Sequence, residues 1–201
     1  MAVHSLGLPA LTEQILWFAG MSAVIAFVAR PALDFRIRNW AGTIAMGVGV
    51  FVLWIGPDLL FPGYRSHWLL SNSITGQVAA GLPEADRSSM AVLLLRGLRA
   101  SLIVPIIEEL FWRAWLMRWL IQPDFSKIPL GTFAPQAFLI VAALFAAEHG
   151  PYWDVGLACG ILYNWWMVRT KSLGDLILAH AITNACLSLY VVAAGKWEYW
   201  A

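Results

Sequence analysis

Two adjacent acids and one base lie near the middle of a strongly apolar run, residues 101–120. The acids are Glu108 and Glu109, and the base is Arg113. Charges inside an apolar span cost a few kcal/mol each on insertion scales, so such residues are functional candidates that need partners. In a helix, Glu109 and Arg113 can pair along one face, since they are four residues apart. Glu108 has no such neighbour, so it either joins a buried ion-pair cluster or serves as a general base.

Three other polar residues lie inside apolar segments. His149 ends the sequence LFAAEHG, and His180 and Asn184 share one helix face in LILAHAITNACL. Each of these side chains needs a polar partner if it is buried, and they can satisfy one another. We therefore predict that they converge with Glu108 on one polar pocket. Glu148 is expected to point elsewhere on its helix.

Such a pocket supports two kinds of hydrolysis. In the first, Glu108 takes a proton from water, and His180 and Asn184 donate hydrogen bonds to the developing oxyanion. In the second, Glu108, His149 and His180 hold a zinc ion with one coordination position left open. The sequence contains no HExxH, which excludes the usual zincin motif, and neither a GxSxG motif nor a pair of intramembrane aspartates stands out.

The composition places these residues in a membrane. Of 201 residues, 60% are hydrophobic and only 12% are charged, with a mean hydropathy of +0.69. Ordinary soluble domains do not have this balance. Several runs approach the roughly 20 apolar residues that cross a bilayer. We predict an all-α, polytopic membrane protein with about six to eight transmembrane helices and a single domain over residues 1–201. No basic run suggests nucleic acid, and Cys159 and Cys186 are expected to be packing residues.

Six apolar segments are expected to position the polar residues. They run over about 11–29, 40–61, 88–122, 133–149, 153–168 and 173–194. The first is expected to be a retained span rather than a cleaved signal peptide. Residues 62–87 form the longest polar piece and predict an interfacial loop or a short surface helix. The segment 88–122 would be about 50 Å long as a helix, so we expect a kink at Pro105.

The placement of Lys and Arg predicts six crossings with both termini outside the cytoplasm, provided that 88–122 crosses once and is not a hairpin. In this topology His149 lies at the outer end of its span, whereas His180 is nearer the inner end of its own. Tilt, or an early end to the helix before His149, must bring the two side chains level.

At these residues the sequence resembles the CAAX prenyl protease and bacteriocin-processing (CPBP, or Abi) family of intramembrane endopeptidases. The family's three motifs are EExxxR, an aromatic residue followed after three residues by His, and HxxxN. They are matched in order by Glu108, Glu109 and Arg113, by Phe145 and His149, and by His180 and Asn184. The match covers about residues 92–194, which we take as the protease core. The first span and residues 62–87 have no motif to match.

The resemblance implies a CAAX protease-like hydrolase that cleaves a membrane-associated or lipidated protein, with the six polar motif residues as its catalytic set. It implies a glutamic endopeptidase in which Glu108 activates water. A mechanism without a bound metal is the favoured one. A zinc metalloprotease is the alternative. Some similar proteins accompany bacterial exosortase sorting systems, so the bacterial plasma membrane is the expected location. Membrane lipid is then expected to contact the protein. The oligomeric state is not predicted.

Two readings without proteolysis remain. A non-enzymatic immunity or maturation factor of a protein-sorting system would keep the motifs as relics, although an intact set of six polar residues argues against this. A proton-coupled transporter is disfavoured, because the sequence shows no inverted repeat.

Overall fold

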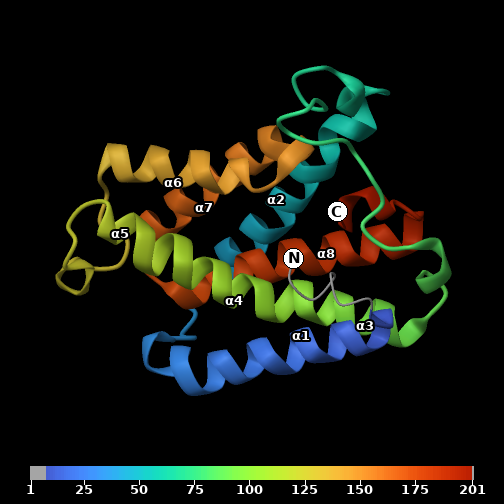
Figure 1. The fold of residues 1–201 in the computed structure, drawn as a ribbon. Helices are drawn as coiled ribbons and strands as arrows, with labels where there is room; N and C mark the ends of the chain where they lie inside the picture. The colour runs from blue at the N-terminus through green and yellow to red at the C-terminus, as the bar shows by residue number, and fades with distance from the viewer. Residues whose placement is uncertain (1–7, 201) are drawn as a thin grey trace.

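The computed structural model describes residues 8–200, and within this range it consists of helices and turns without a β-strand (Figure 1). The predicted all-α class is therefore confirmed. The α-helices are α1 (Ala10–Val24), α2 (Trp40–Leu60), α3 (Met90–Leu98), α4 (Val104–Glu109), α5 (Met117–Trp119), α6 (Pro135–Ala147), α7 (Trp153–Thr170) and α8 (Leu173–Ala194).

The helices α3, α4 and α5 are parts of one continuous helix, Met90–Trp119. Two π-helical segments, Arg99–Ile103 and Leu110–Leu116, join them. Residues 88–122 therefore do not form a hairpin. The wide π turn lies directly before Pro105, where it accommodates a residue that lacks an N–H and crowds the preceding turn. The irregularity expected at Pro105 is thus a change of helical winding just ahead of it.

Four of the described helices are long and apolar enough to cross a membrane: Ala10–Ala32, Trp40–Leu60, Met90–Trp119 and Leu173–Ala194. The helix α6 is apolar but has only 13 residues. These four are candidate spans by length and composition, and the predicted count of six to eight is not confirmed. Large apolar side chains such as Phe27 (85% exposed) and Leu189 (72% exposed) face outward, as contact with lipid requires. The chain is an integral membrane protein.

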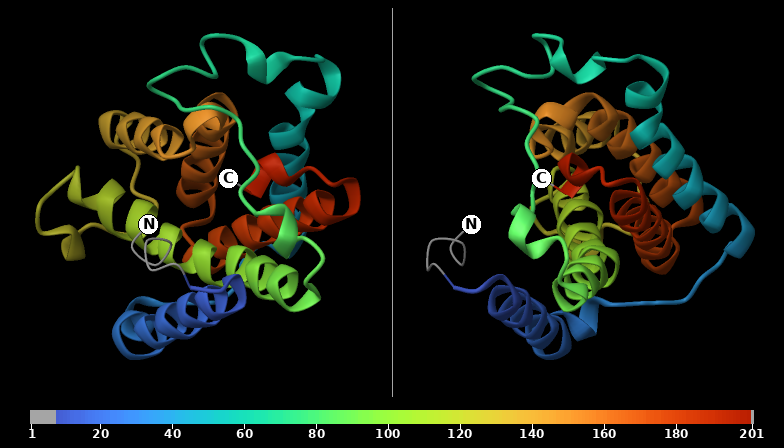
Figure 2. Two further views of the ribbon diagram at one scale, coloured as in Figure 1. Left: turned by 45° about the vertical axis from the view of Figure 1, so that its right-hand side comes forward. Right: turned by 90° about the vertical axis from the view of Figure 1, so that its right-hand side faces the viewer.

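The long helix Met90–Trp119 lies between α1 and the other helices. The helix α8 packs against α2, α3 and α4, and α6 packs against α7. On the other side, α1 lies along the outside of the long helix and contacts α3 and the π-helical segment Arg99–Ile103. Figure 2 shows α1 on the outer side of the long helix, away from α2, α6 and α7. The core of the bundle therefore lies among α2, α4, α6, α7 and α8.

A glycine lets α2 and α8 approach closely. A Cβ atom on Gly47 would lie 2.6 Å from the carbonyl oxygen of Ala179. The Thr183 hydroxyl donates a hydrogen bond to the Gly47 carbonyl (2.8 Å) and accepts one from the Tyr163 hydroxyl (2.8 Å). Small residues at such a contact are typical of membrane helix pairs. This contact fixes α8 at the turn that follows His180.

Asp175 fixes the beginning of α8. Its carboxylate accepts hydrogen bonds from the backbone N–H groups of Arg38 (2.7 Å) and Asn39 (2.9 Å) and from the Thr43 hydroxyl (2.8 Å). The Ser172 side chain caps the helix by accepting from the Asp175 N–H (3.1 Å). The connection between α1 and α2 is thereby tied to α8, five residues before His180.

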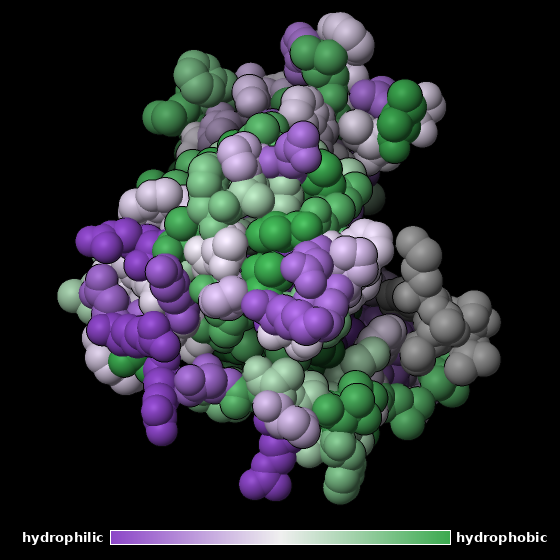
Figure 3. All heavy atoms as spheres, turned by 90° about the vertical axis from the view of Figure 1, so that its left-hand side faces the viewer, coloured by the Kyte–Doolittle hydropathy of each residue, from purple (hydrophilic) through white to green (hydrophobic). Residues whose placement is uncertain are grey.

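Hydrophilic side chains gather at the end of the bundle that carries the loop between α5 and α6, and hydrophobic side chains cover much of the remaining face (Figure 3). At this end Arg118 donates hydrogen bonds to the carbonyls of Ala114 (2.8 Å) and Ile128 (2.6 Å). Arg38 donates to the carbonyl of Thr170 (3.3 Å). Arg38 and Arg118 thus each bind backbone carbonyls near this end of the bundle.

Candidate active site

Glu108, His149, His180 and Asn184 line one cavity of about 220 Å³. They come from α4, from the end of α6 and from α8, so the predicted convergence is observed. The helix α6 ends at Ala147, and a 3-10 turn, Gly150–Tyr152, follows His149. We expected either helix tilt or an early helix end to bring His149 to the same depth as His180. The structure shows the early helix end, because α6 stops two residues before His149.

Glu108 presents an unsatisfied acceptor at this cavity. Its Oε2 atom is buried and has no hydrogen-bond partner among the described residues. The closest basic group is His180, whose Nε2 lies 3.9 Å from Glu108 Oε2. A buried carboxylate oxygen normally has a partner. This oxygen is therefore free to hold a water molecule or a substrate group in the cavity.

His180 is held by the second acid. Its Nδ1 lies 2.7 Å from Glu109 Oε1. Both Glu109 oxygens also accept hydrogen bonds from Arg113 Nη1 (3.0 Å each), and both residues are completely buried. Because an ionised carboxylate can only accept, the His180 proton in this bond belongs on Nδ1. The other ring nitrogen, Nε2, is left facing Glu108.

Arg113 connects this pair to two further helices. Its Nε donates to Asn164 Oδ1 on α7 (2.9 Å), and Asn164 Nδ2 donates to the Phe138 carbonyl on α6 (2.8 Å). The guanidinium also lies 4.6 Å from the centre of the Phe145 ring. Arg113 and Glu109 do not line the cavity, so they position His180 rather than contact substrate. Sequence reasoning missed Asn164, whose only signal was a lone amide in an apolar segment.

His149 is oriented by its own helix. Its Nδ1 lies 2.6 Å from the Phe145 carbonyl oxygen, which can only accept, so Nδ1 carries the proton. In the neutral ring this leaves Nε2 as an acceptor. The Phe145 and Trp54 rings flank the imidazole, with centroids at 4.7 and 5.1 Å. The aromatic residue of the second motif thus supplies both a carbonyl and a packing surface.

Asn184 uses one of its amide protons on the backbone. Its Nδ2 donates to the carbonyl of Ala100 (2.9 Å), which belongs to the π-helical segment Arg99–Ile103. An amide nitrogen carries two protons, so one remains for a ligand in the cavity. Tyr163, which the sequence did not single out, also lines the cavity, and its ring lies 5.1 Å from that of His180.

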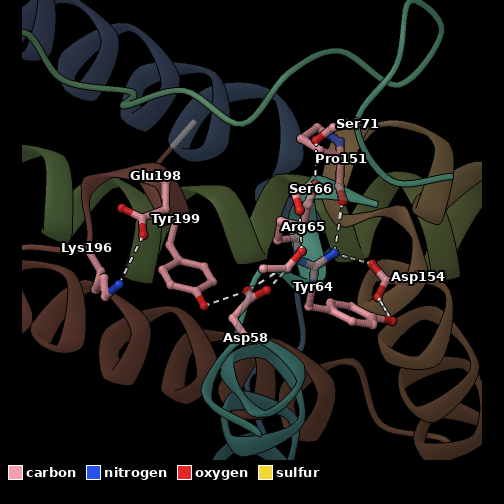
Figure 4. Close-up of polar contacts among 11 residues, drawn as sticks. Asp58, Tyr64, Arg65, Ser66, Ser71, Pro151, Asp154, Lys196, Glu198 and Tyr199 are labelled. Carbon is pink, nitrogen blue, oxygen red and sulfur yellow. Dashed lines mark hydrogen bonds and ion pairs between the residues drawn. The ribbon is translucent and has the colours of Figure 1, made fainter. Parts of the chain in front are cut away.

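The turn after His149 is anchored by the loop that carries no motif. Arg65 donates to the Pro151 carbonyl (2.9 Å) and to Asp58 (3.0 Å), and it forms an ion pair with Asp154. Figure 4 shows Arg65 between these three groups. The Tyr199 hydroxyl donates to Asp58 (2.7 Å). Burial and this hydrogen bond raise the pKa of Tyr199, so the phenol stays protonated and remains a donor.

Two further contacts join the same loop to this turn. The indole of Trp153 donates to the Leu69 carbonyl (3.0 Å), and a Cβ atom on Gly150 would lie 2.9 Å from the Thr75 carbonyl oxygen. Gly150 has a φ of +53°, which glycine adopts most easily. Residues 62–87 form two 3-10 turns, Tyr64–Ser66 and Glu84–Asp86, within an irregular loop. The loop packs over the backbone that follows His149.

Glu148 lies outside the cavity, as the sequence suggested. Its carboxylate accepts a hydrogen bond from the Trp112 indole (3.2 Å). Among residues 8–200, no three His, Cys, Asp or Glu side chains are grouped so that they could hold a metal ion. The set Glu108, His149 and His180 therefore does not form a ligand group in this arrangement. The zinc alternative stays a prediction.

Residues 90–186 match the family model described as Type II CAAX prenyl endopeptidase Rce1-like. The matched range includes all three motifs, and it excludes α1, α2 and the loop 62–87. The search of the curated proteins and the search of the solved structures gave no match.

Proposed function

We propose, from the match of residues 90–186 to the Rce1-like family of type II CAAX prenyl endopeptidases, that this chain is an intramembrane endopeptidase in which Glu108 activates water. One observation carries the proposal. The carboxylate of Glu108 lies in a cavity inside the bundle with one oxygen buried and unpartnered, and an oriented imidazole lies 3.9 Å away. Few structural roles leave a buried carboxylate oxygen in this state.

The first step is the attack of water on a peptide carbonyl. Glu108 accepts a proton from the water as its oxygen bonds to the carbonyl carbon, which gives a tetrahedral intermediate. As the intermediate collapses, the C–N bond breaks, and the protonated Glu108 returns its proton to the leaving nitrogen. The products are a carboxylic acid and an amine, and Glu108 ends as a carboxylate.

We assign the stabilisation of the oxyanion to two groups on α8. Asn184 offers its second amide proton, while the first holds the π-helical segment. His180 can donate from Nε2 only as an imidazolium, because Nδ1 already donates to Glu109. We assign Glu109, itself held by Arg113, the task of fixing the His180 ring so that Nε2 faces the cavity.

His149 is assigned to the water rather than to the oxyanion. Its bare Nε2 can accept a hydrogen bond from the second proton of the attacking water, because Nδ1 is committed to the Phe145 carbonyl. Two acceptors, Glu108 and His149, would then fix the orientation of the water's lone pair toward the substrate. The substrates proposed are membrane-associated or lipidated proteins, and the bacterial plasma membrane is the proposed location.

The test is cleavage of a membrane-embedded peptide reporter by the purified protein in lipid. Glu108→Gln is nearly isosteric but cannot accept a proton, so it is expected to abolish cleavage while the variant still binds the reporter. Glu148→Gln is the matched control, because Glu148 interacts electrostatically with Glu108 but lies outside the cavity. Full activity of Glu108→Gln would remove this site from the reaction. No cleavage by the wild type of any membrane reporter would favour the immunity or maturation factor.

A further inference from the structure

The chain turns back after α8 and forms part of the wall of the catalytic cavity. Gly195, with a φ of +66°, caps the end of α8, and a 3-10 turn, Trp197–Trp200, packs against that helix (Figure 1). We call this turn the aromatic segment. Two of its side chains, Tyr199 and Trp200, line the catalytic cavity. The aromatic segment lies outside residues 90–186, so the family match does not describe it.

Contacts with two helices hold the end of the aromatic segment. The Trp200 indole donates to the Ser188 hydroxyl on α8 (3.4 Å), and Arg96 on the long helix donates to the Trp200 carbonyl. The guanidinium of Arg96 also lies 5.4 Å from the centre of the Trp200 ring. Ser188 and Arg96 line the cavity as well. Trp200 therefore joins two helices that both form walls of the cavity.

The rest of the aromatic segment is held by the loop 62–87 and by α2. The Gly81 N–H donates to the carbonyl of Trp197 (3.2 Å). The Tyr199 hydroxyl donates to Asp58 near the end of α2 (2.7 Å), as Figure 4 shows. Contacts with a loop and three helices make the aromatic segment a fixed wall of the cavity.

The aromatic segment lies farther along α8 than the catalytic groups do. His180, Asn184 and Ser188 follow one another at four-residue intervals on this helix, and all three line the cavity. Because an α-helix rises about 1.5 Å per residue, Ser188 lies about 12 Å beyond His180 and about 6 Å beyond Asn184. Trp200 is bonded to Ser188, so it lies at about this distance from the two proposed oxyanion donors.

We propose that Tyr199 and Trp200 close a substrate subsite and restrict it to small side chains. The proposal rests on the proposed function and adds a specificity determinant to it. An extended peptide covers about 3.4 Å per residue. If the scissile carbonyl lies between His180 and Asn184, the substrate residue beside the aromatic segment is about two to four residues from the scissile bond. A large side chain at that position would meet the indole ring.

The restriction depends on rings that cannot turn aside. The indole of Trp200 is only 6% exposed, with its N–H bonded to Ser188 and the Arg96 guanidinium over its face. The ring of Tyr199 is tied to Asp58 through its hydroxyl. Extra volume in such a packed place forces side chains out of their preferred rotamers and is costly. The cavity has a volume of only about 220 Å³, so a bulky group has little room beside the rings.

The first experiment measures kcat/KM of the wild-type protein for a set of reporters in phosphatidylcholine vesicles. The parent reporter carries alanine on both sides of the cleaved bond, and tryptophan then replaces one alanine at a time. We expect tryptophan about two to four residues from the bond, on one side only, to lower kcat/KM roughly 10-fold or more. Equal rates across this range on both sides would overturn the subsite and leave the peptidase intact. If no reporter is cleaved, the proposed function fails instead.

The second experiment enlarges the subsite. The quantity compared is the ratio of kcat/KM for the alanine reporter to that for the tryptophan reporter. Trp200→Ala is expected to lower this ratio roughly 10-fold, because the substrate indole then takes the space of the deleted one. Trp166→Ala is the matched control, since Trp166 is also 6% exposed but lies on α7 and does not line the cavity. An equal fall of the ratio in Trp166→Ala would overturn the proposal.

A milder variant guards against misfolding of Trp200→Ala. Trp200→Leu deletes less of the buried side chain and should lower the ratio by an intermediate amount. Thermal melts in detergent show which variants are folded. An unchanged ratio in a folded variant at this position would mean that the indole does not limit the substrate, and the proposal would be wrong. The dependence on side-chain size in the wild type needs no variant, so it tests the subsite in either case.

Discussion

The two nitrogens of His180 face two consecutive glutamates. Nδ1 lies 2.7 Å from Glu109 Oε1, and Nε2 lies 3.9 Å from Glu108 Oε2. Glu109 is completely buried and also bonded to Arg113, whereas Glu108 borders the cavity. Neighbouring residues of identical type therefore occupy different environments, one closed and one open. This difference separates a structural task from a chemical one.

The different environments of the two glutamates predict different stabilities for Glu109→Gln and Glu108→Gln. Glu109→Gln leaves Arg113 without its buried carboxylate and should destabilise the protein by about 3–5 kcal/mol. Glu108→Gln removes a charge that has no hydrogen-bonded partner on Oε2, so the protein should remain folded. Thermal melts of both variants in detergent measure the difference. Equal losses would show that the two acids share one structural role.

The assignment of His180 and Asn184 as oxyanion donors predicts what happens when each side chain is truncated. His180→Ala and Asn184→Ala should each slow single-turnover cleavage by about 100-fold or more, as loss of one oxyanion donor does. The loss should appear in the rate of the chemical step rather than in reporter binding. Asn184→Ala also frees the Ala100 carbonyl, so Thr183→Val on the same helix serves as a control for disturbance of α8. A similar slowing in that control would remove the assignment.

The sequence predicted the positions of six apolar segments and the convergence of four polar residues, because both follow from strong local signals. Apolar runs have a length set by the bilayer, and a polar side chain inside one must find a partner. The sequence did not reveal that His180 bonds to Glu109. That bond depends on the relative rotation of α4 and α8, which the π-helical segment and the close contact at Gly47 determine together.

The anchoring of His149 was also beyond sequence reasoning. Arg65 lies in a loop without a motif, and its partners Asp58 and Asp154 are 7 and 89 residues away. Long-range polar contacts of this kind leave no periodic pattern, so they become visible only with the fold.

The two candidate mechanisms predict different metal contents. If Glu108 alone activates water, purified active protein should contain negligible zinc, and chelators should have little effect on cleavage. If zinc is the catalyst, His180→Ala should lose the metal, and chelators should inactivate the wild type. Metal analysis and single-turnover cleavage on the same samples separate the two. Stoichiometric zinc that tracks activity across the variants would overturn the glutamate mechanism.

The contact between α2 and α8 predicts opposite results for two glycines in one helix. Gly47→Ala places a Cβ atom 2.6 Å from the Ala179 carbonyl oxygen, so the helices must separate and the protein should lose stability. Gly49→Ala has no atom within 4 Å of the added Cβ and should be neutral or stabilise by up to about 1 kcal/mol. Thermal melts of the two variants test this. Similar melting temperatures would mean that α2 and α8 are not closely packed in the membrane.

The contacts that Arg65 makes from the loop 62–87 predict that it positions the turn after His149. Arg65→Lys keeps the positive charge but cannot bond to Asp58, Asp154 and the Pro151 carbonyl at once. The turn after His149 should then loosen, and kcat should fall by about 10-fold or more, since small displacements near a reacting group are costly. The KM of the reporter should change less, because Arg65 does not line the cavity.

Arg118→Lys is the matched control for that variant. Arg118 also joins a helix to a loop through two backbone carbonyls, but it lies at the α5–α6 end of the bundle. Both variants should lose some thermal stability, and only Arg65→Lys should lose kcat at a temperature well below its melting point. If both lose kcat equally, Arg65 is a general stabilising residue. If neither does, the orientation of His149 does not depend on the loop, and its own helix with the Phe145 carbonyl suffices to hold the ring.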